Sequence, residues 1–210
     1  MADKLRIYAY FDGSNFYHYC LQSYGIKRIN FFDFTNHVSK IDSEKVIKIK
    51  YFNCPLNQQE YPSIYKKQQK FFEDLKKTTL VELLLGNLVK RPLGKINIDC
   101  PSCSHQRSES LNCPKCKRRI NVKRCFKYIE KGVDVKLATQ MLVDAMDDKY
   151  DIALLFSSDS DYCPAIRYIV KNLKKDVVYC HFPNKKTYEL TQVCTESRLI
   201  TKDIIENSKK

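Results

Sequence analysis

The stretch Ile152-Ala153-Leu154-Leu155-Phe156-Ser157-Ser158-Asp159-Ser160-Asp161 joins an apolar run to two closely spaced acids. The same arrangement occurs near the N-terminus, where the apolar residues 5–11 precede Asp12-Gly13-Ser14-Asn15. Continuous apolar runs are typical of strands that are buried on both faces of a parallel sheet. Open α/β folds place their functional sites at the carboxyl edge of such a sheet. The two stretches therefore predict an α/β fold with an acidic site at this edge.

The rest of the chain alternates strand-like and helical segments. Further apolar runs predict strands at residues 46–52, 80–85 and 177–181. Helical patterns occupy residues 14–22, 62–77, 134–146, 162–173 and 187–197. Strands that alternate with helices indicate a mostly parallel central sheet covered on both faces, which is a three-layer fold.

Length and charge narrow the functional classes. The 210 residues are enough for one ordinary domain, and the formal net charge of +13 favours a polyanionic partner, nucleic acid before a membrane surface. The chain has no run of 18 apolar residues and no signal-peptide core, so we expect a cytoplasmic protein without a membrane partner. A homo-oligomer is compatible with the sequence. Dinucleotide-binding and P-loop motifs are absent from it.

Residues 90–131 interrupt the alternation and carry twelve lysines and arginines against three acids. We interpret the chain as a single domain, 1–210, with this basic segment inserted after the third strand. The insertion contains two C-x-x-C turns separated by nine residues. Their cysteines are Cys100, Cys103, Cys113 and Cys116. Two such turns can complete a tetrahedral Zn²⁺ site, so the pattern predicts a small zinc-ribbon-like insertion with structural zinc. The alternative is a redox pair or surface thiols.

A basic run follows the second C-x-x-C turn. Six of the ten residues from 115 to 124 are basic, and none is acidic. Such a run can be merely a solvated surface, but beside an acidic site it favours contact with a phosphate backbone. The candidate nucleic-acid-binding residues are Lys115, Lys117, Arg118, Arg119, Lys123 and Arg124. The six cysteines outside the C-x-x-C turns have apolar neighbours, and we expect them to be buried thiols.

Four acids form the candidate catalytic set: Asp12, Asp134, Asp159 and Asp161. Each has an ordinary explanation, because Asp12 suits a turn and Asp159 or Asp161 suits a helix N-cap. Caps need one acid each, however, and clustered carboxylates repel one another unless a cation or a proton neutralises them. Carboxylate oxygens are the ligands that Mg²⁺ and Mn²⁺ prefer. The set therefore predicts a divalent-metal site.

Three motifs, in this order, resemble the NYN domain family. The segments Asp12-Gly13-Ser14-Asn15, Lys131-Gly132-Val133-Asp134 and Ser157-Ser158-Asp159-Ser160-Asp161-Tyr162 match its D-G-x-N, K-G-x-D and S-x-D-x-D-F/Y patterns. That family belongs to the PIN-like nucleases and includes the LabA-like bacterial proteins. The resemblance implies a PIN-like α/β fold and a metal-dependent nuclease site, usually for RNA.

The resemblance also implies roles for single residues. Asp12, Asp134, Asp159 and Asp161 would be the acidic metal ligands, and Asn15 would orient the metal or the substrate. Ser157 occupies the small polar position of the family, and Lys131 would touch a phosphate.

The expected activity is hydrolysis of phosphodiester bonds by an endoribonuclease, with one or two Mg²⁺ or Mn²⁺ ions activating water and stabilising the leaving oxygen. One alternative is a nucleic-acid-binding adaptor that retains the acidic pocket without catalysis. Another is a nucleotide-sugar transferase, because Asp159-Ser160-Asp161 also forms a D-x-D metal motif. That second alternative leaves the cysteines and the basic charge unexplained.

Overall fold

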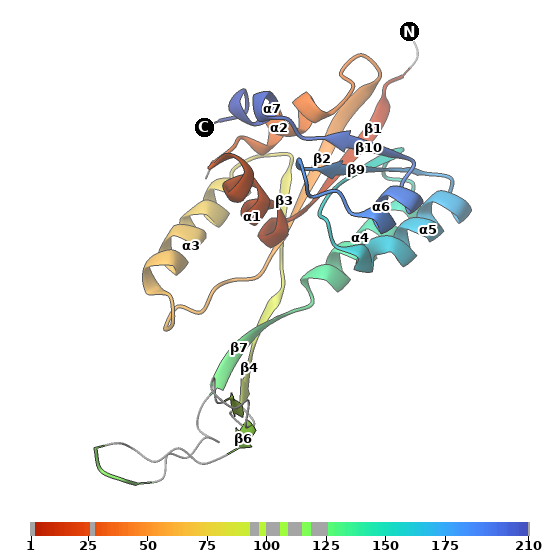
Figure 1. Cartoon of the computed structure of the whole chain (residues 1–210). Coiled ribbons are helices and arrows are strands. Elements are labelled where there is room, and N and C mark those ends of the chain that lie inside the picture. The colour runs from red at the N-terminus through yellow and green to blue at the C-terminus, as the bar shows by residue number, and fades with distance from the viewer. Residues whose placement is uncertain are drawn as a thin grey trace. The chain divides into compact units, whose positions relative to one another are not determined.

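Figure 1 shows the computed structural model of the chain. The structure describes residues 3–25, 28–92, 97–99, 106–108, 115–118 and 126–209. It divides into two compact units, one formed by Met1–Asn87 with Gly132–Lys210 and the other by Leu88–Lys131.

The first unit is built on a six-stranded sheet with the strand order β10-β9-β8-β1-β2-β3. All neighbouring strands in it run parallel. The chain adds β2 and β3 on one side of β1, and β8, β9 and β10 on the other side. The strand order therefore reverses between β1 and β8, the position where open α/β sheets form a crevice at their carboxyl edge. The strands are β1 (Leu5–Asp12), β2 (Glu44–Asn53), β3 (Val81–Leu85), β8 (Ile152–Phe156), β9 (Asp176–His181) and β10 (Glu196–Leu199).

Helices cover both faces of the sheet, with α4, α5 and α6 packed together on one side and α1 and α3 on the other (Figure 1). This arrangement gives the three layers expected of a parallel α/β fold. The helices are α1 (Gly13–Tyr24), α2 (Phe31–Val38), α3 (Pro62–Lys76), α4 (Val133–Met146), α5 (Cys163–Asn172), α6 (Tyr188–Val193) and α7 (Lys202–Glu206), and a short 3₁₀ turn spans Ser160–Tyr162.

Aromatic rings join the two central strands on one face of the sheet. Phe11 of β1 and Phe156 of β8 are register partners, and their rings stack with centroids 4.1 Å apart. Phe16 of α1 packs edge-on against both rings. This apolar cluster holds the ends of β1 and β8 together, directly before the acids that follow both strands.

A buried ion pair fixes α4 to the other face. Asp144 of α4 is fully buried, and its Oδ2 atom lies 2.6 Å from Lys50 Nζ of β2 and 2.8 Å from the Tyr10 hydroxyl of β1. The amide of Gln140 donates to its other oxygen at 3.0 Å. These contacts satisfy a charge that would be costly to bury alone, and they hold α4 across β1 and β2.

The structure confirms the five predicted strands: β1 and β9 are each one residue longer than predicted and β2 three residues longer, β3 is one residue shorter, and β8 has the predicted bounds. It confirms the predicted helices at α1, α3, α4 and α5, whereas the helix predicted for 187–197 is wrong beyond residue 193. Residues 196–199 form the edge strand β10 instead. That segment, Glu196-Ser197-Arg198-Leu199, has no apolar run that would predict a strand. Its Arg198 instead pairs with the nearly buried Glu44 at 2.6 Å. The short helices α2 and α7 were not predicted.

The second unit contains short strands. β4 (Asn87–Pro92) and β7 (Phe126–Lys131) form one two-stranded sheet, and β5 (Asn97–Asp99) pairs antiparallel with β6 (Gln106–Ser108). Of the four predicted zinc ligands the structure describes only Cys116, an exposed free thiol, whereas Cys100, Cys103 and Cys113 lie outside the described residues. The zinc site and the ribbon therefore stay predictions.

Cys20, Cys54, Cys163 and Cys180 are buried thiols as predicted, and Cys194 is partly buried. Cys125 lies outside the described residues. Burial raises the pKa of the Cys20 thiol to about 11, so this thiol stays protonated at neutral pH. Among the helices described by the structure, none is both long enough and apolar enough to cross a membrane.

Candidate active site

Asp12 ends β1 and lies at the centre of the site. Its side chain is only 5% exposed, and its Oδ1 atom accepts the backbone N–H of Asn15 at 3.1 Å. The turn needs Gly13 because a Cβ atom there would lie 2.6 Å from the Phe52 carbonyl oxygen and from the Tyr51 ring. The close approach of the backbone to β2 therefore explains the glycine of the Asp12-Gly13 motif.

The turn after β8 is hydrogen-bonded to the turn after β1. The hydroxyl of Ser157 donates to Asp12 Oδ2 at 3.1 Å and accepts the backbone N–H of Asp159 at 3.2 Å. The backbone N–H of Ser158 donates to Asn15 Oδ1 at 3.3 Å. Ser157 and Asn15 thus connect the two strand ends and place Asp159 beside Asp12.

Asp134 reaches the same place from the first turn of α4. Gly132 precedes the helix with a φ of 82°, a left-handed conformation that glycine adopts readily. The Asp134 carboxylate is exposed, and its Oδ1 atom accepts the hydroxyl of Tyr162 at 3.1 Å. The same hydroxyl lies 3.4 Å from Asp12 Oδ2. Tyr162 thus brings two of the predicted ligands, more than 120 residues apart in sequence, to one oxygen atom.

The electrostatics of the site reflect this crowding. Burial raises the pKa of the Asp12 carboxyl, the bonds from Asn15 and Ser157 lower it, and the charges of Asp134 and Asp159 raise it further, so that the net shift is upward. Burial, followed by the charges of Asp12 and Asp134, also raises the pKa of Tyr162. The hydroxyl therefore keeps its proton and serves as a hydrogen-bond donor.

The ordinary roles of the acids are present too. Asp12 caps α1 through Asn15, and Asp159 caps the 3₁₀ turn by accepting the backbone N–H of Asp161 at 2.9 Å. The side chain of Asp161 is exposed. Capping does not account for Asp134, because the residue that caps α4 is Gly132 and makes no side-chain cap bond. The structure thus brings Asp12, Asp134, Asp159 and Asn15 together, and it relates Asp161 to them through its backbone.

The donor set has the chemistry that a hard cation needs. Over the described ranges, no group of three or more acidic, histidine or cysteine side chains forms a ready-made metal site. Mg²⁺ is nevertheless commonly held by one or two carboxylates, with water and substrate phosphates completing its shell. Asp12 and Asp134, which contact the same hydroxyl, are two such carboxylates. A bound cation would also relieve the repulsion between their charges.

Tyr162 is the site residue whose role the sequence did not reveal. It supplied the last letter of the S-x-D-x-D-F/Y pattern, but the pattern gives no reason for an aromatic residue there. The structure gives one, because the ring is fully buried and its hydroxyl meets two carboxylates.

The predicted phosphate-binding residues belong to the second unit. Lys115, Lys117, Arg118 and Lys131 are exposed. Arg119, Lys123 and Arg124 lie outside the described residues. Their contact with nucleic acid stays a prediction.

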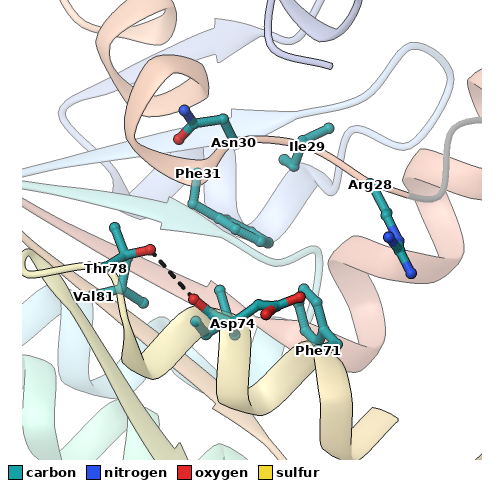
Figure 2. Close-up of a pocket in the computed structure, with 9 residues that line it drawn as sticks. Arg28, Ile29, Asn30, Phe31, Phe71, Asp74, Thr78 and Val81 are labelled. Atoms are coloured by element: carbon teal, nitrogen blue, oxygen red, sulfur yellow. Dashed lines mark hydrogen bonds between the residues drawn. The ribbon is translucent and has the colours of Figure 1, made fainter. Parts of the chain in front are cut away.

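Figure 2 shows a pocket that does not belong to this site. It opens between the start of α2 and the end of α3, where the Thr78 hydroxyl bonds to the Asp74 carbonyl at 3.5 Å. None of the four candidate acids lines it. The acidic site is therefore identified from its carboxylates.

Comparison with known proteins agrees with this fold. A model of the NYN domain family matches residues 6–201. No curated protein matches the chain. Among solved structures, the crystal structure of a protein of unknown function from Vibrio parahaemolyticus superposes with a TM-score of 0.59 at 18% identity, covering 97% of this chain and 98% of that chain. At that identity the likeness shows a shared fold.

Proposed function

This chain belongs to the NYN domain family of PIN-like nucleases, and from that premise we propose that it is a Mg²⁺- or Mn²⁺-dependent endoribonuclease. The observation that carries the proposal is the meeting of Asp12 and Asp134 at the Tyr162 hydroxyl. It lies at the carboxyl edge of the sheet, where the strand order reverses and α/β enzymes bind their substrates.

Each residue has a defined part in this proposal. Asp12 and Asp134 would hold the cation directly, and Asp159 would add negative charge from the turn after β8. A bound Mg²⁺ or Mn²⁺ supplies an activated water and charge stabilisation at the phosphate. Asn15 and Ser157 connect the two strand ends, and Tyr162 orients the carboxylates through its hydroxyl, which lies 3.1 Å from Asp134 and 3.4 Å from Asp12. Asp161, with its exposed side chain, would act through water.

The charge of the protein supports a nucleic-acid substrate, because a formal +13 attracts polyanions. We further propose that Cys100, Cys103, Cys113 and Cys116 hold one structural Zn²⁺ and that the basic run from 115 to 124 contacts phosphates. The spacing of the cysteines and the clustering of positive charge support both statements.

The test is cleavage by the purified chain of labelled single-stranded RNA, structured RNA and DNA, each with Mg²⁺, Mn²⁺ or EDTA. We expect RNA fragments only with added metal. Asp134→Asn should reduce turnover by at least about 100-fold, because it removes a cation ligand. Asp147→Asn is the matched control, since Asp147 is an exposed acid at the other end of the same helix.

Equal turnover of the Asp134→Asn and Asp147→Asn variants would reject the proposed site. The second candidate, a non-catalytic adaptor, predicts a different result: RNA binds tightly, but no metal yields fragments. The presence of Asp134 and Asp159 near the buried Asp12 favours the enzyme, because three acids that repel one another have no use in an adaptor without a metal.

A further inference from the structure

The loop between β9 and α6 is hydrogen-bonded to the acidic site. We call residues 182–187 the Lys185 loop. The Lys185 carbonyl accepts the Ser158 hydroxyl at 3.0 Å, and the Thr187 hydroxyl donates to the Ser158 carbonyl at 2.7 Å. The backbone N–H of Thr187 also donates to the Tyr179 hydroxyl of β9 at 3.1 Å. Ser158 directly precedes Asp159 and bonds to Asn15, so the loop lies beside the candidate ligands.

This loop carries two adjacent cations, Lys185 and Lys186, both exposed. The Lys185 ammonium lies 5.3 Å from the centroid of the Tyr19 ring on α1. Tyr19 follows Asn15 by four residues and therefore lies on the same side of the helix one turn later. The cation–π contact thus holds a positive charge close to Asn15, where the phosphates of a bound strand would pass.

An exposed aromatic residue follows the two lysines. Tyr188 is 72% exposed, and no tyrosine or phenylalanine among the exposed residues described by the structure is more accessible. Adjacent cations and an accessible ring are the combination with which proteins hold unpaired nucleic acid, because the cations follow the backbone and the ring stacks on a base. A duplex would not offer its bases in this way.

We propose that the Lys185 loop and Tyr188 form the surface that guides an unpaired nucleic-acid strand into the acidic site. Lys185 and Lys186 contact phosphates, and Tyr188 stacks on a base next to the bond to be cleaved. The inference rests on the proposed nuclease function and adds the location and the class of the substrate, a single-stranded segment.

The experiment measures binding without cleavage. Fluorescence anisotropy in EDTA compares a labelled single-stranded RNA of about 12 nucleotides with a duplex of the same sequence. The test variants are Lys185→Ala with Lys186→Ala, Tyr188→Ala and Tyr188→Phe. The loop should keep its fold in all of them, because Lys185 bonds to Ser158 through its backbone carbonyl. Circular dichroism and thermal unfolding check this.

Matched controls lie elsewhere on the same unit. Lys66→Ala with Lys67→Ala removes two adjacent exposed lysines from α3, and Tyr168→Ala removes an exposed tyrosine from α5. Every comparison is repeated with Lys117, Arg118 and Arg119 replaced by Ala, so that contacts of the basic run cannot hide those of the loop.

We expect the double lysine variant to bind single-stranded RNA about tenfold more weakly, with a log-log salt slope shallower by about 1.4 for two lost contacts. Tyr188→Ala should weaken binding by about 5- to 160-fold, and Tyr188→Phe should bind like the parent protein, because stacking needs only the ring. Duplex binding and the control variants should change by less than about twofold.

Equal affinities of the loop variants and the controls would overturn the inference. An equal loss on the duplex would overturn the assignment to unpaired strands. These outcomes are separate from those of the cleavage assay. If the loop variants lose binding while no metal gives fragments, the nuclease proposal fails and the strand-binding surface stands. Metal-dependent cleavage with unaltered binding by the loop variants leaves the nuclease and removes the surface.

Discussion

The hydroxyl of Tyr162 lies 3.1 Å from a carboxylate oxygen of Asp134. The same hydroxyl lies 3.4 Å from a carboxylate oxygen of Asp12. A phenol has one proton, so it can donate fully to only one of the two carboxylates at a time. Because burial and both negative charges raise the pKa of Tyr162, that proton stays in place at neutral pH. The two acids thus share a single donor.

Tyr162→Phe tests this shared donor. The ring would still fill its buried position, but Asp12 and Asp134 would lose their common hydrogen bond. We expect the Mn²⁺ concentration for half-maximal cleavage to rise by about 10-fold or more, as when other orienting partners of metal ligands are removed. Tyr168→Phe, at an exposed tyrosine of α5, is the control. Identical metal dependence in the two variants would show that the hydroxyl orients nothing.

Asp12→Asn should separate stability from activity. The carboxylate is buried beside two other acids, which disfavours its charged form. We expect urea unfolding at pH 7 in EDTA to show a higher free energy of unfolding for the variant, while metal-dependent cleavage is lost. Asp161→Asn, at an exposed acid of the same site, should change stability by less than about 0.5 kcal/mol. A destabilised Asp12→Asn protein would mean that the cap of α1 outweighs the repulsion.

Elemental analysis tests the cysteine segment. We expect one tightly held zinc per chain in protein purified without chelator, and loss of that zinc when Cys100 or Cys113 is replaced by Ser. Cys125→Ser, at another cysteine of the same segment, should keep the metal. Freely titratable thiols at all four positions, with no zinc bound, would contradict the site.

The salt dependence of binding tests the basic run. Replacing Lys117, Arg118 and Arg119 with Ala should make the log-log salt slope shallower by up to about 2 to 3 units, if all three contact phosphates. Turnover at saturating RNA should fall much less than affinity, because these residues position the strand. Alanine at Lys66, Lys67 and Lys70 of α3 removes the same charge and is the control. Unchanged affinity with lost turnover would instead place the run in the chemistry.

Arg6 and Asp151 give the fold a pH-dependent contact. The Arg6 guanidinium lies 2.8 Å from Asp151, and its hydrogen bonds lower the pKa of that carboxyl from 3.8 to about 2. A lowered pKa in the folded state means that the stabilisation is complete above about pH 4 and is lost as the pH falls towards about 2. We expect Asp151→Asn to cost about 1 kcal/mol at pH 6, allowing for solvent screening.

Urea unfolding between pH 6 and pH 2.5 measures this difference, which should shrink steadily below about pH 4. Added salt should also reduce it, because both side chains are partly exposed. A difference that stays constant to pH 2.5 would show that Arg6 does not act through the charge of Asp151.

The sequence predicted the parts of the fold that depend on apolar runs and the part of the site that depends on acids. The strand at 152–156 and residues 9–11 of the strand at 5–11 are buried on both faces, so their apolar composition alone identifies them. The edge strand β10 escaped prediction because its polar side chains pair with charges across the sheet, as Arg198 does with Glu44. The position of the Lys185 loop beside Ser158 could not be predicted from the sequence either, because it depends on hydrogen bonds between residues that are 27 or more positions apart.

The residues of the candidate site come from two stretches of sequence, one before and one after the second unit. Asp12 lies on β1 before residues 88–131, whereas Asp134 and Asp159 follow them, and all six strands of the main sheet lie outside that segment. A break of the polypeptide within 88–131 would therefore distribute the carboxylates over two chains without removing any strand. The parallel pairing of β1 with β8 and the stack of Phe11 on Phe156 would then be intermolecular contacts. If the proposed nuclease activity is correct, metal-dependent cleavage would then report the reassembly of the two fragments.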